Sequence, residues 1–203
     1  YSMKPLKENA SDQMKIPYRW FFTSTGKLVV GGKSSTQNDE LLMKLKRSGK
    51  EYTVLHTTEP GSPFVVIRAP QSEISENDLD ESAIFTGCFS RAWKLRKKKT
   101  TVDIFNLSQL FKTKEMKAGT WGIKGKIKRV SVKLELVLIK QEGKLRAVPE
   151  KTADGKNYFL KVRPGKNDKS DMLVKFQFEL KQTFTQEELL AALPAGGVTI
   201  VRN

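Results

Sequence analysis

Cysteine and histidine are almost absent from this sequence, with one residue of each in 203. A single cysteine, Cys88, excludes a disulfide framework within the chain and suits a reducing compartment. A zinc site needs about four N, S or O ligands, which one histidine, His56, and one distant cysteine do not supply. We therefore predict no metal site and no cofactor, and we expect a cytoplasmic protein.

Long apolar runs are also missing. No segment approaches the roughly 20 apolar residues that cross a bilayer, so we expect neither a membrane-spanning helix nor a signal peptide. The phosphate loop pattern G-x-x-x-x-G-K-[ST] is absent, and we expect neither nucleotide hydrolysis nor a small-molecule substrate. The segment "GKSSTQND" does place a glycine before an expected helix. An anion at that helix start stays open, with Lys33 and Asn38 as the nearest side chains.

Acidic residues are scarce beside basic ones, with 22 Asp or Glu against 37 Lys or Arg. The excess lies in one region, because residues 91–175 carry 24 basic and 8 acidic side chains, whereas residues 1–90 carry 11 of each. Lysines that only improve solubility would scatter along the chain. A segregated positive charge favours a polyanionic partner, and nucleic acid is the leading hypothesis. Binding to DNA or to an anionic membrane is a weaker one.

Hydrophobic periodicity predicts a single α+β domain with a mixed, largely antiparallel sheet and packed helices. Residues 1–17 lack an apolar period and are expected to form a flexible lead-in, with the domain at 18–203. Strands are predicted at 19–24, 27–30, 51–57, 64–69, 100–107, 129–139, 144–149, 157–165 and 198–203. Helices are predicted at 37–47, within 72–94 after a cap at Ser75, and within 185–197 after a Thr185–Glu188 capping box, with a stop at Pro194. The acids at the start of the second helix are expected to complement its dipole. Residues 170–182 fit a helix better than a strand.

The predicted helix at 72–94 leads directly into the most basic segment. Its apolar face ends at Trp93, which is expected in the core. The segment "SRAWKLRKKK" places six cations and one indole within ten residues, and "GTWGIKGKIKR" surrounds Trp121 with lysines. Cations that neutralise phosphates, beside rings that stack on bases, are typical of binding to single-stranded or looped RNA. For Trp121 a core position and a base-stacking role both stay open.

His56 raises the question of catalysis, because Glu59 and Ser62 follow it in the turn "TTEPGSP". A catalytic histidine needs a nucleophile within hydrogen-bond reach and a group that orients the ring. No G-x-S-x-G elbow surrounds Ser62. The favoured interpretation is that His56 ends a strand and hydrogen-bonds the loop backbone. An RNA-processing or RNA-modifying enzyme centred on these three residues is the alternative.

Four segments occur in a distinctive order: "RWFFTSTGKLVVGGKSSTQNDELL", "LHTTEPGSPFVVI", "ESAIFTGCFSRAW" and "GTWGIKGK". This series resembles the NFACT-R domain, the RNA-binding module of the NFACT ribosome-quality-control proteins. The later segments "LELVLIKQEGKLRAVP", "YFLKVRPGKNDKSD" and "EELLAALPAGG" resemble the downstream part of archaeal members. The glycosylase-like domain and coiled coil of full NFACT proteins have no counterpart, so the chain resembles a stand-alone, archaeal-type form.

The resemblance implies an α+β domain that contacts rRNA or tRNA at the large ribosomal subunit, in translation or ribosome quality control, rather than a self-contained enzyme. The positions that match the family pattern are Arg19, Trp20, Gly26, Gly32, Gln37, Asn38, His56, Gly61, Ser62, Pro63, Ser90, Trp93, Gly119 and Gly125. The family usually has a small residue and then an acid after the histidine. This chain has Thr57 and Thr58 there, with Glu59 one place later.

The cations after residue 90 are expected to contact phosphates, while the hairpin at Arg19 and the loop at His56 shape a more selective groove. The full set of candidate RNA-binding residues is Arg19, Trp20, Lys33, Asn38, His56, Ser62, Arg91, Lys94, Arg96, Lys97, Lys98, Lys99, Trp121, Lys124, Lys126 and Lys128.

Overall fold

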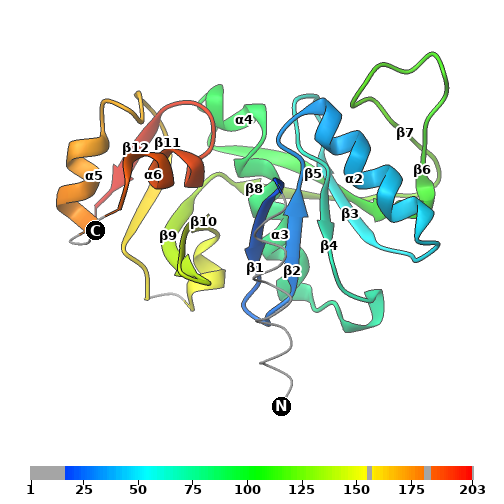
Figure 1. The fold of residues 1–203 in the computed structure, drawn as a ribbon, viewed down its shortest axis with the longest axis horizontal. Helices are drawn as coiled ribbons and strands as arrows, with labels where there is room; N and C mark the ends of the chain where they lie inside the picture. The colour runs from blue at the N-terminus through cyan, green and yellow to red at the C-terminus, as the bar shows by residue number, and fades with distance from the viewer. Residues whose placement is uncertain (1–16, 155–156, 181–183, 203) are drawn as a thin grey trace.

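The structure, a computed structural model, describes residues 17–154, 157–180 and 184–202. Residues 1–16 of the expected lead-in lie outside this range. Two antiparallel sheets share a continuous hydrophobic core and carry the helices on their faces (Figure 1). The predicted α+β fold is confirmed, and every strand pair in the described ranges is antiparallel.

The larger sheet has six strands in the order β1-β2-β4-β3-β5-β8. Its first two strands form the predicted hairpin, whose turn includes Gly26 at a φ of 87° that favours glycine. The strands are β1 (Arg19–Phe22), β2 (Leu28–Gly31), β3 (Thr53–Thr57), β4 (Val65–Ile67), β5 (Lys99–Asn106) and β8 (Lys128–Lys133).

The smaller sheet has four strands in the order β10-β9-β11-β12 and is built from the second half of the chain. Its strands are β9 (Leu136–Gln141), β10 (Lys144–Val148), β11 (Leu160–Asn167) and β12 (Val198–Val201). A separate two-stranded ribbon pairs β6 (Leu110–Phe111) with β7 (Gly122–Ile123). The predicted strands at 144–149, 157–165 and 198–203 correspond to β10, β11 and β12.

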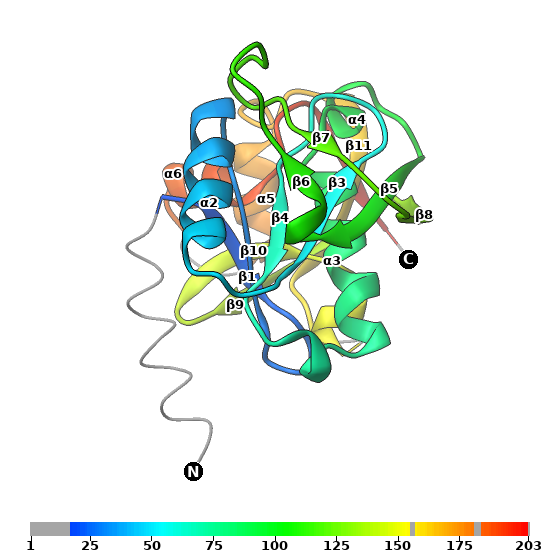
Figure 2. The same cartoon turned by 90° about the vertical axis from the view of Figure 1, so that its right-hand side faces the viewer.

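Helices cover opposite faces of the six-stranded sheet (Figures 1 and 2). Strand residues alternate between the two faces, so Val54 packs with helix α2 (Ser35–Arg47) and its neighbour Leu55 packs with helix α3 (Glu76–Cys88). The α3 side continues into the smaller sheet and forms the larger core. The β1–β2 hairpin forms one edge of the larger sheet and contacts the smaller sheet there. Phe22 N–H of β1 donates to Gln141 Oε1 of β9 at 2.8 Å.

Three further helices complete the described fold. They are α4 (Arg91–Lys94), α5 (Leu173–Leu180) and α6 (Gln186–Ala192), and single 3₁₀ turns occur at Gln71–Glu73, Leu107–Gln109 and Glu150–Ala153. The helix preference of residues 170–182 is confirmed over the described part of that segment. The predicted cap of α6 is confirmed as well, because Thr185 Oγ1 accepts from Glu188 N at 3.0 Å.

The prediction of one helix over 72–94 was wrong, because the helix ends at Cys88 and α4 begins anew at Arg91. Ser90 causes the break: its hydroxyl donates to Gly87 O at 2.6 Å and accepts from Ala92 N at 3.2 Å, which caps the new helix. The basic segment therefore does not continue α3. It ends α4 and then enters β5.

The single strand predicted at 129–139 is also two strands. β8 belongs to the larger sheet and β9 to the smaller one, with Leu134 and Glu135 between them. Apolar alternation continues across the junction because Leu134 is buried in the core that both sheets share. Glu135 forms ion pairs with three cations at the same junction. Its carboxylate oxygens lie 3.3 Å from Lys133 Nζ, 3.6 Å from Lys161 Nζ and 2.6 Å from Arg163 Nε.

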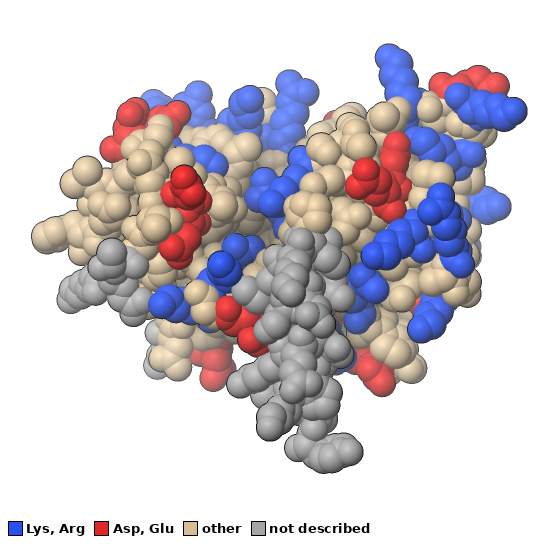
Figure 3. Space-filling model, in the orientation of Figure 1, with Lys and Arg blue, Asp and Glu red and all other residues tan. Residues whose placement is uncertain are grey.

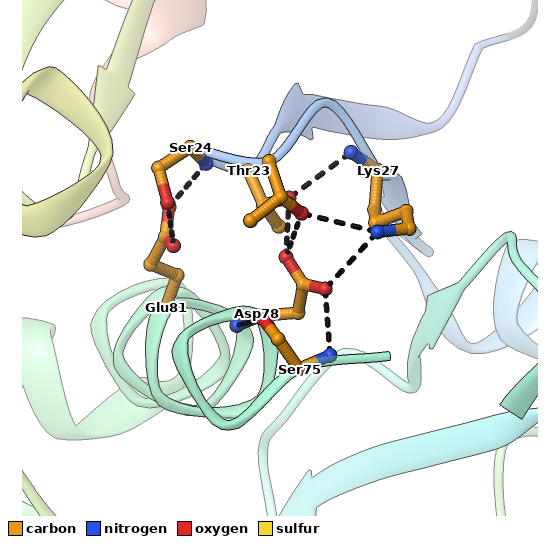
Figure 4. A network of polar contacts seen from close by, with 7 residues as sticks. Thr23, Ser24, Lys27, Ser75, Asp78 and Glu81 are labelled. Atoms are coloured by element: carbon orange, nitrogen blue, oxygen red, sulfur yellow. Dashed lines mark hydrogen bonds and ion pairs between the residues drawn. The ribbon is translucent and has the colours of Figure 1, made fainter. Parts of the chain in front are cut away.

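Two buried carboxylates of α3 fasten the turn of the β1–β2 hairpin (Figure 4). Asp78 Oδ1 accepts from the hydroxyls of Thr23 at 2.7 Å and Thr25 at 2.6 Å. Glu81 accepts from Ser24 N at 2.8 Å and from the Ser24 hydroxyl at 2.6 Å. The sequence pattern explained these acids only as complements of the helix dipole, but they also hold the hairpin that carries Arg19 and Trp20.

Asp78 is ionised in this network. Its Oδ2 accepts from Ser75 N at 2.9 Å in a capping box and lies 3.4 Å from Lys27 Nζ (Figure 4). Burial raises the pKa of Asp78, but the bonds from Ser75, Thr25 and Thr23 and the charge of Lys27 outweigh it, so the net pKa is lowered. A carboxylate without these partners would be costly to bury.

Candidate nucleic-acid interface

His56 lies in β3 and is held by residues on either side of the loop that follows, Thr57 and Phe64. Its Nδ1 is 2.7 Å from Thr57 O, and its ring packs at a tilt against Phe64 with centroids 4.3 Å apart. Burial lowers the pKa of His56, against the opposing effects of the Thr57 carbonyl and Asp103. The imidazole is therefore neutral at neutral pH. It contacts a backbone carbonyl as the favoured interpretation expected, but that carbonyl belongs to Thr57 at the end of β3 rather than to the loop.

Ser62 is likewise engaged by the loop backbone. Its hydroxyl accepts from Thr57 N at 3.1 Å and donates to Pro63 O at 2.8 Å. In the described part of the chain, no hydrogen bond joins His56 to Ser62 or to Glu59. The structure thus shows none of the nucleophile–base contacts that the enzyme alternative requires.

Asn38 ties helix α2 to the same loop. It is buried, and its Oδ1 accepts from Phe64 N at 3.1 Å. Gly32 permits this approach, since a Cβ there would lie 2.2 Å from Asn38 Oδ1. The side chain that was expected beside an anion thus has a structural partner, while Lys33 is exposed at the mouth of the cavity that His56, Ser62 and Trp121 line.

The segment from Arg91 to Lys99 forms an exposed ridge, which we call the basic ridge: Arg91, Lys94, Arg96, Lys97, Lys98 and Lys99. None of these six side chains forms an ion pair with a described carboxylate. Figure 3 shows Lys and Arg at the top of the view, where α4 lies in Figure 1. Arg91 N donates to Gly61 O at 2.8 Å, so the fold brings the ridge against the His56 loop.

The second basic segment lies elsewhere. Lys99 pairs with Lys133 and Ile104 with Lys128 in the β5–β8 ladder, so Lys128 is five residue steps from the ridge, about 17 Å at roughly 3.4 Å per residue. Lys124 and Lys126 are exposed, and Gln109 fixes their turn by donating to both backbone carbonyls. Lys128 Nζ is 3.8 Å from Glu76 Oε2. The two segments are therefore separate patches.

Trp121 is half-buried against the α2 core. Its Nε1 donates to Asp39 Oδ1 at 2.8 Å, and Lys112 Nζ lies 5.2 Å from its ring centroid. Gly119 N also donates to Asp39, at 3.1 Å. Asp39, which the sequence pattern did not single out, thus clamps the lysine-containing loop between β6 and β7 onto α2.

Trp20 and Arg19 lie in a cleft between the two sheets. Trp20 is 7% exposed, and Arg146 of β10 lies over its ring with Cζ 4.5 Å from the centroid. Arg19 Cζ lies 4.7 Å from the centroid of Phe89. Arg146 was missed by sequence reasoning because it lies in a different sheet, 127 positions along the chain from Arg19. The only sequence signal for it is a cation within the alternating strand "KLRAV".

Two neighbouring cavities, which share Arg19 and Lys33 in their linings, lie between this cleft and the His56 loop. One, of about 320 Å³, is lined by Arg19, Lys33 and Arg146, and the other, of about 720 Å³, by Arg19, Lys33 and His56. Figure 3 shows cationic side chains in the hollow between the two halves of the molecule.

No helix among the described residues is long and apolar enough to cross a membrane.

Comparison with protein families gives a match to the NFACT protein RNA binding domain over residues 17–125, more than half of the chain. The archaeal Rqc2 homolog aRqcH of Methanocaldococcus jannaschii is 32% identical over an alignment of 224 residues, which covers 98% of this chain and 32% of that protein. The mouse and human ribosome quality control complex subunit NEMF is 30% identical over 80 residues, 39% of this chain and 7% of that protein.

The chain thus spans about a third of the length of its archaeal relative. Among solved structures, the C-terminal part of the fibronectin/fibrinogen-binding protein from Streptococcus suis is similar, with a TM-score of 0.51 and 20% identity. That similarity covers 63% of this chain and 55% of the other, and it supports the fold.

Proposed function

The chain belongs to the NFACT RNA-binding domain family, and from this premise we propose that it binds RNA in ribosome quality control. In this proposal residues 18–203 act as one RNA-binding domain. The RNA is rRNA or tRNA at the large ribosomal subunit, and the protein works in the cytoplasm. The proposal concerns a binding protein, because His56 and Ser62 are engaged by backbone groups rather than by each other.

The observation that carries the proposal is the basic ridge. Its six cations project from one short segment, and none is neutralised by a described carboxylate. Exposed cations held at this density raise the local concentration of a polyanion and release its counterions on binding. The adjoining His56 loop and the cleft at Arg19 offer a hollow beside the ridge for a single strand or an RNA loop.

The test replaces Lys97, Lys98 and Lys99 together by Gln and measures affinity for rRNA and tRNA fragments over a range of salt concentrations. If each lysine replaces one counterion, the slope of log K against log salt falls in magnitude by about 2, and affinity near 0.1 M salt falls by about a hundredfold. The matched control replaces Lys44, Lys46 and Lys50, which are exposed and also form no ion pair with a described carboxylate. Equal effects of the two triple variants would contradict a ridge-centred interface.

A further inference from the structure

Four cations from three parts of the chain line the cleft between the β1–β2 hairpin and strand β10, and one of them is the exposed Lys144. Arg19, Lys33 and Arg146 all line the cavity of about 320 Å³. None of them has a carboxylate oxygen within 4.0 Å among the described residues. Glu187 and Glu188 of α6 line the same cavity without reaching these cations. Cations therefore outnumber carboxylates in the lining, and Arg19, Lys33 and Arg146 form no ion pair with a described carboxylate.

Aromatic rings hold the two guanidinium groups in place. Arg19 lies over Phe89 and Arg146 over Trp20, at 4.7 and 4.5 Å from the ring centroids. Arg146 Nε also donates to Leu145 O at 2.7 Å, which fixes the inner edge of that guanidinium. A guanidinium that stacks on a ring keeps the donors at its outer edge free, in the planar geometry that matches phosphate oxygens. The network around Asp78 anchors the hairpin that carries Arg19.

The charge of Arg19 disfavours the charged forms of Arg146 and Lys33. Burial lowers the pKa of Arg146 to about 10, and the charge of Arg19 adds to this effect. Burial likewise lowers the pKa of Lys33, and so do the charges of Arg19 and Arg146. Partly buried like charges are unfavourable without a counter-charge, so an anion in the cleft would relieve the repulsion.

We propose that this cleft binds a phosphate group, which Arg19 and Arg146 contact through paired donors while Lys33 supplies a third charge. The source of the phosphate rests on the proposed function, since an RNA backbone, an RNA end and a nucleotide share this chemistry. The cleft differs from the basic ridge in kind. Exposed lysines attract any polyanion, whereas two oriented guanidinium groups select the geometry of one phosphate.

The experiment measures thermal unfolding in inorganic phosphate against chloride at the same ionic strength. At a phosphate concentration ten times the Kd, the melting temperature of the native chain should rise by about 3–6 °C. Arg146→Met keeps an apolar stem over Trp20 and should abolish the rise. In chloride, Arg146→Met should melt no lower than the native chain, because it removes repulsion.

Two further variants make the result decisive. Lys33→Gln changes an exposed side chain and should also remove the phosphate effect, which provides a test if Arg146→Met folds poorly. Lys140→Met is the matched control, because Lys140 also lies over a ring, that of Phe184 at 5.3 Å, in the same sheet but outside the cleft. It should retain the full rise. The proposal would be overturned if phosphate did not raise the melting temperature of the native chain. It would also be overturned if phosphate still raised the melting temperature of both Arg146→Met and Lys33→Gln.

The source of the phosphate is separated by comparing a 5′-hydroxyl RNA oligonucleotide, its 5′-phosphorylated form and a nucleoside monophosphate. Dependence on Arg146 with the 5′-hydroxyl oligonucleotide identifies a backbone phosphate, and dependence only with the other two identifies a terminal one. If no RNA binds while inorganic phosphate still raises the melting temperature, the proposed function fails and the cleft site stands. If RNA binds through the ridge but phosphate has no effect, the cleft site fails alone.

Discussion

Replacing Asp78 by Asn should be among the most damaging single-atom changes in this protein. The Asp78 side chain is fully buried, with 0% exposure, and it accepts from the hydroxyls of Thr23 and Thr25 and from Ser75 N. Asparagine preserves the shape but removes the charge and turns an NH₂ group toward one set of donors. Hydrogen bonds to a charged group contribute about 1.5–3 kcal/mol each, against about 0.5–1.5 for neutral partners. Three such bonds give a loss of about 3–5 kcal/mol.

The assay is unfolding in urea followed by circular dichroism, with Asp80→Asn as the control. Asp80 is on the same helix and is half exposed. Among the described residues its ion pair is with the half-exposed Lys151, at 3.3 Å, so its replacement should cost less than about 1 kcal/mol. If Asp78→Asn and Asp80→Asn destabilise the chain equally, the hairpin anchor does not have the energetic role that its geometry indicates.

The pH dependence gives the same reasoning an independent check. The pKa of Asp78 is lowered on folding. Its stabilising contribution is therefore complete above its unfolded pKa, about 4, and is lost as the pH falls toward the folded value. The difference in free energy of unfolding between the native chain and Asp78→Asn should therefore be constant near neutral pH and become smaller below about pH 4. A difference that instead becomes smaller as the pH rises above 7 would refute the assignment.

Two other substitutions test how the basic segments are held. Asp39→Asn should accelerate hydrogen exchange at Gly119 N and at the Trp121 indole while lowering overall stability by only about 1 kcal/mol, and Glu40→Gln, next to it and exposed, should change neither. Gly87→Ala should destabilise the chain by about 1–2 kcal/mol in urea unfolding despite alanine's better helix propensity, because its Cβ would lie 2.7 Å from Val132 Cγ2.

Most helices and strands were predictable because their signals are local. The hairpin at β1–β2, the caps at Ser75 and Thr185 and the alternation in β10 each depend on residues a few positions apart. The two errors occur where apolar spacing continues across a break. Phe89 and Trp93 keep helical spacing although Ser90 caps a new helix between them. Spacing reports which side chains are buried, not whether the backbone between them is continuous.

The candidate site was predictable only in part, for the opposite reason. The basic ridge is contiguous in sequence, so composition reveals it. The cleft is not, because β1 and β10 place Arg19 and Arg146 side by side only after both sheets have formed. Asp78 and Asp39 show the same limit: their partners Thr23 and Trp121 are 55 and 82 positions away. A charge count along the chain cannot distinguish a carboxylate that clamps a loop from one that faces water.

In the proposed RNA interface, binding by the basic ridge and binding by the cleft should therefore depend differently on salt concentration. Cations of the ridge are exposed, so their attraction is screened within about 8–10 Å at ordinary ionic strength. Arg19 and Arg146 are partly buried against rings, so their contacts with a phosphate are screened less. High salt should remove the contribution of the ridge first and leave a weaker, geometry-dependent binding. Affinity measured at high salt is thus the condition in which a change at Arg146 should outweigh changes at Lys97, Lys98 and Lys99.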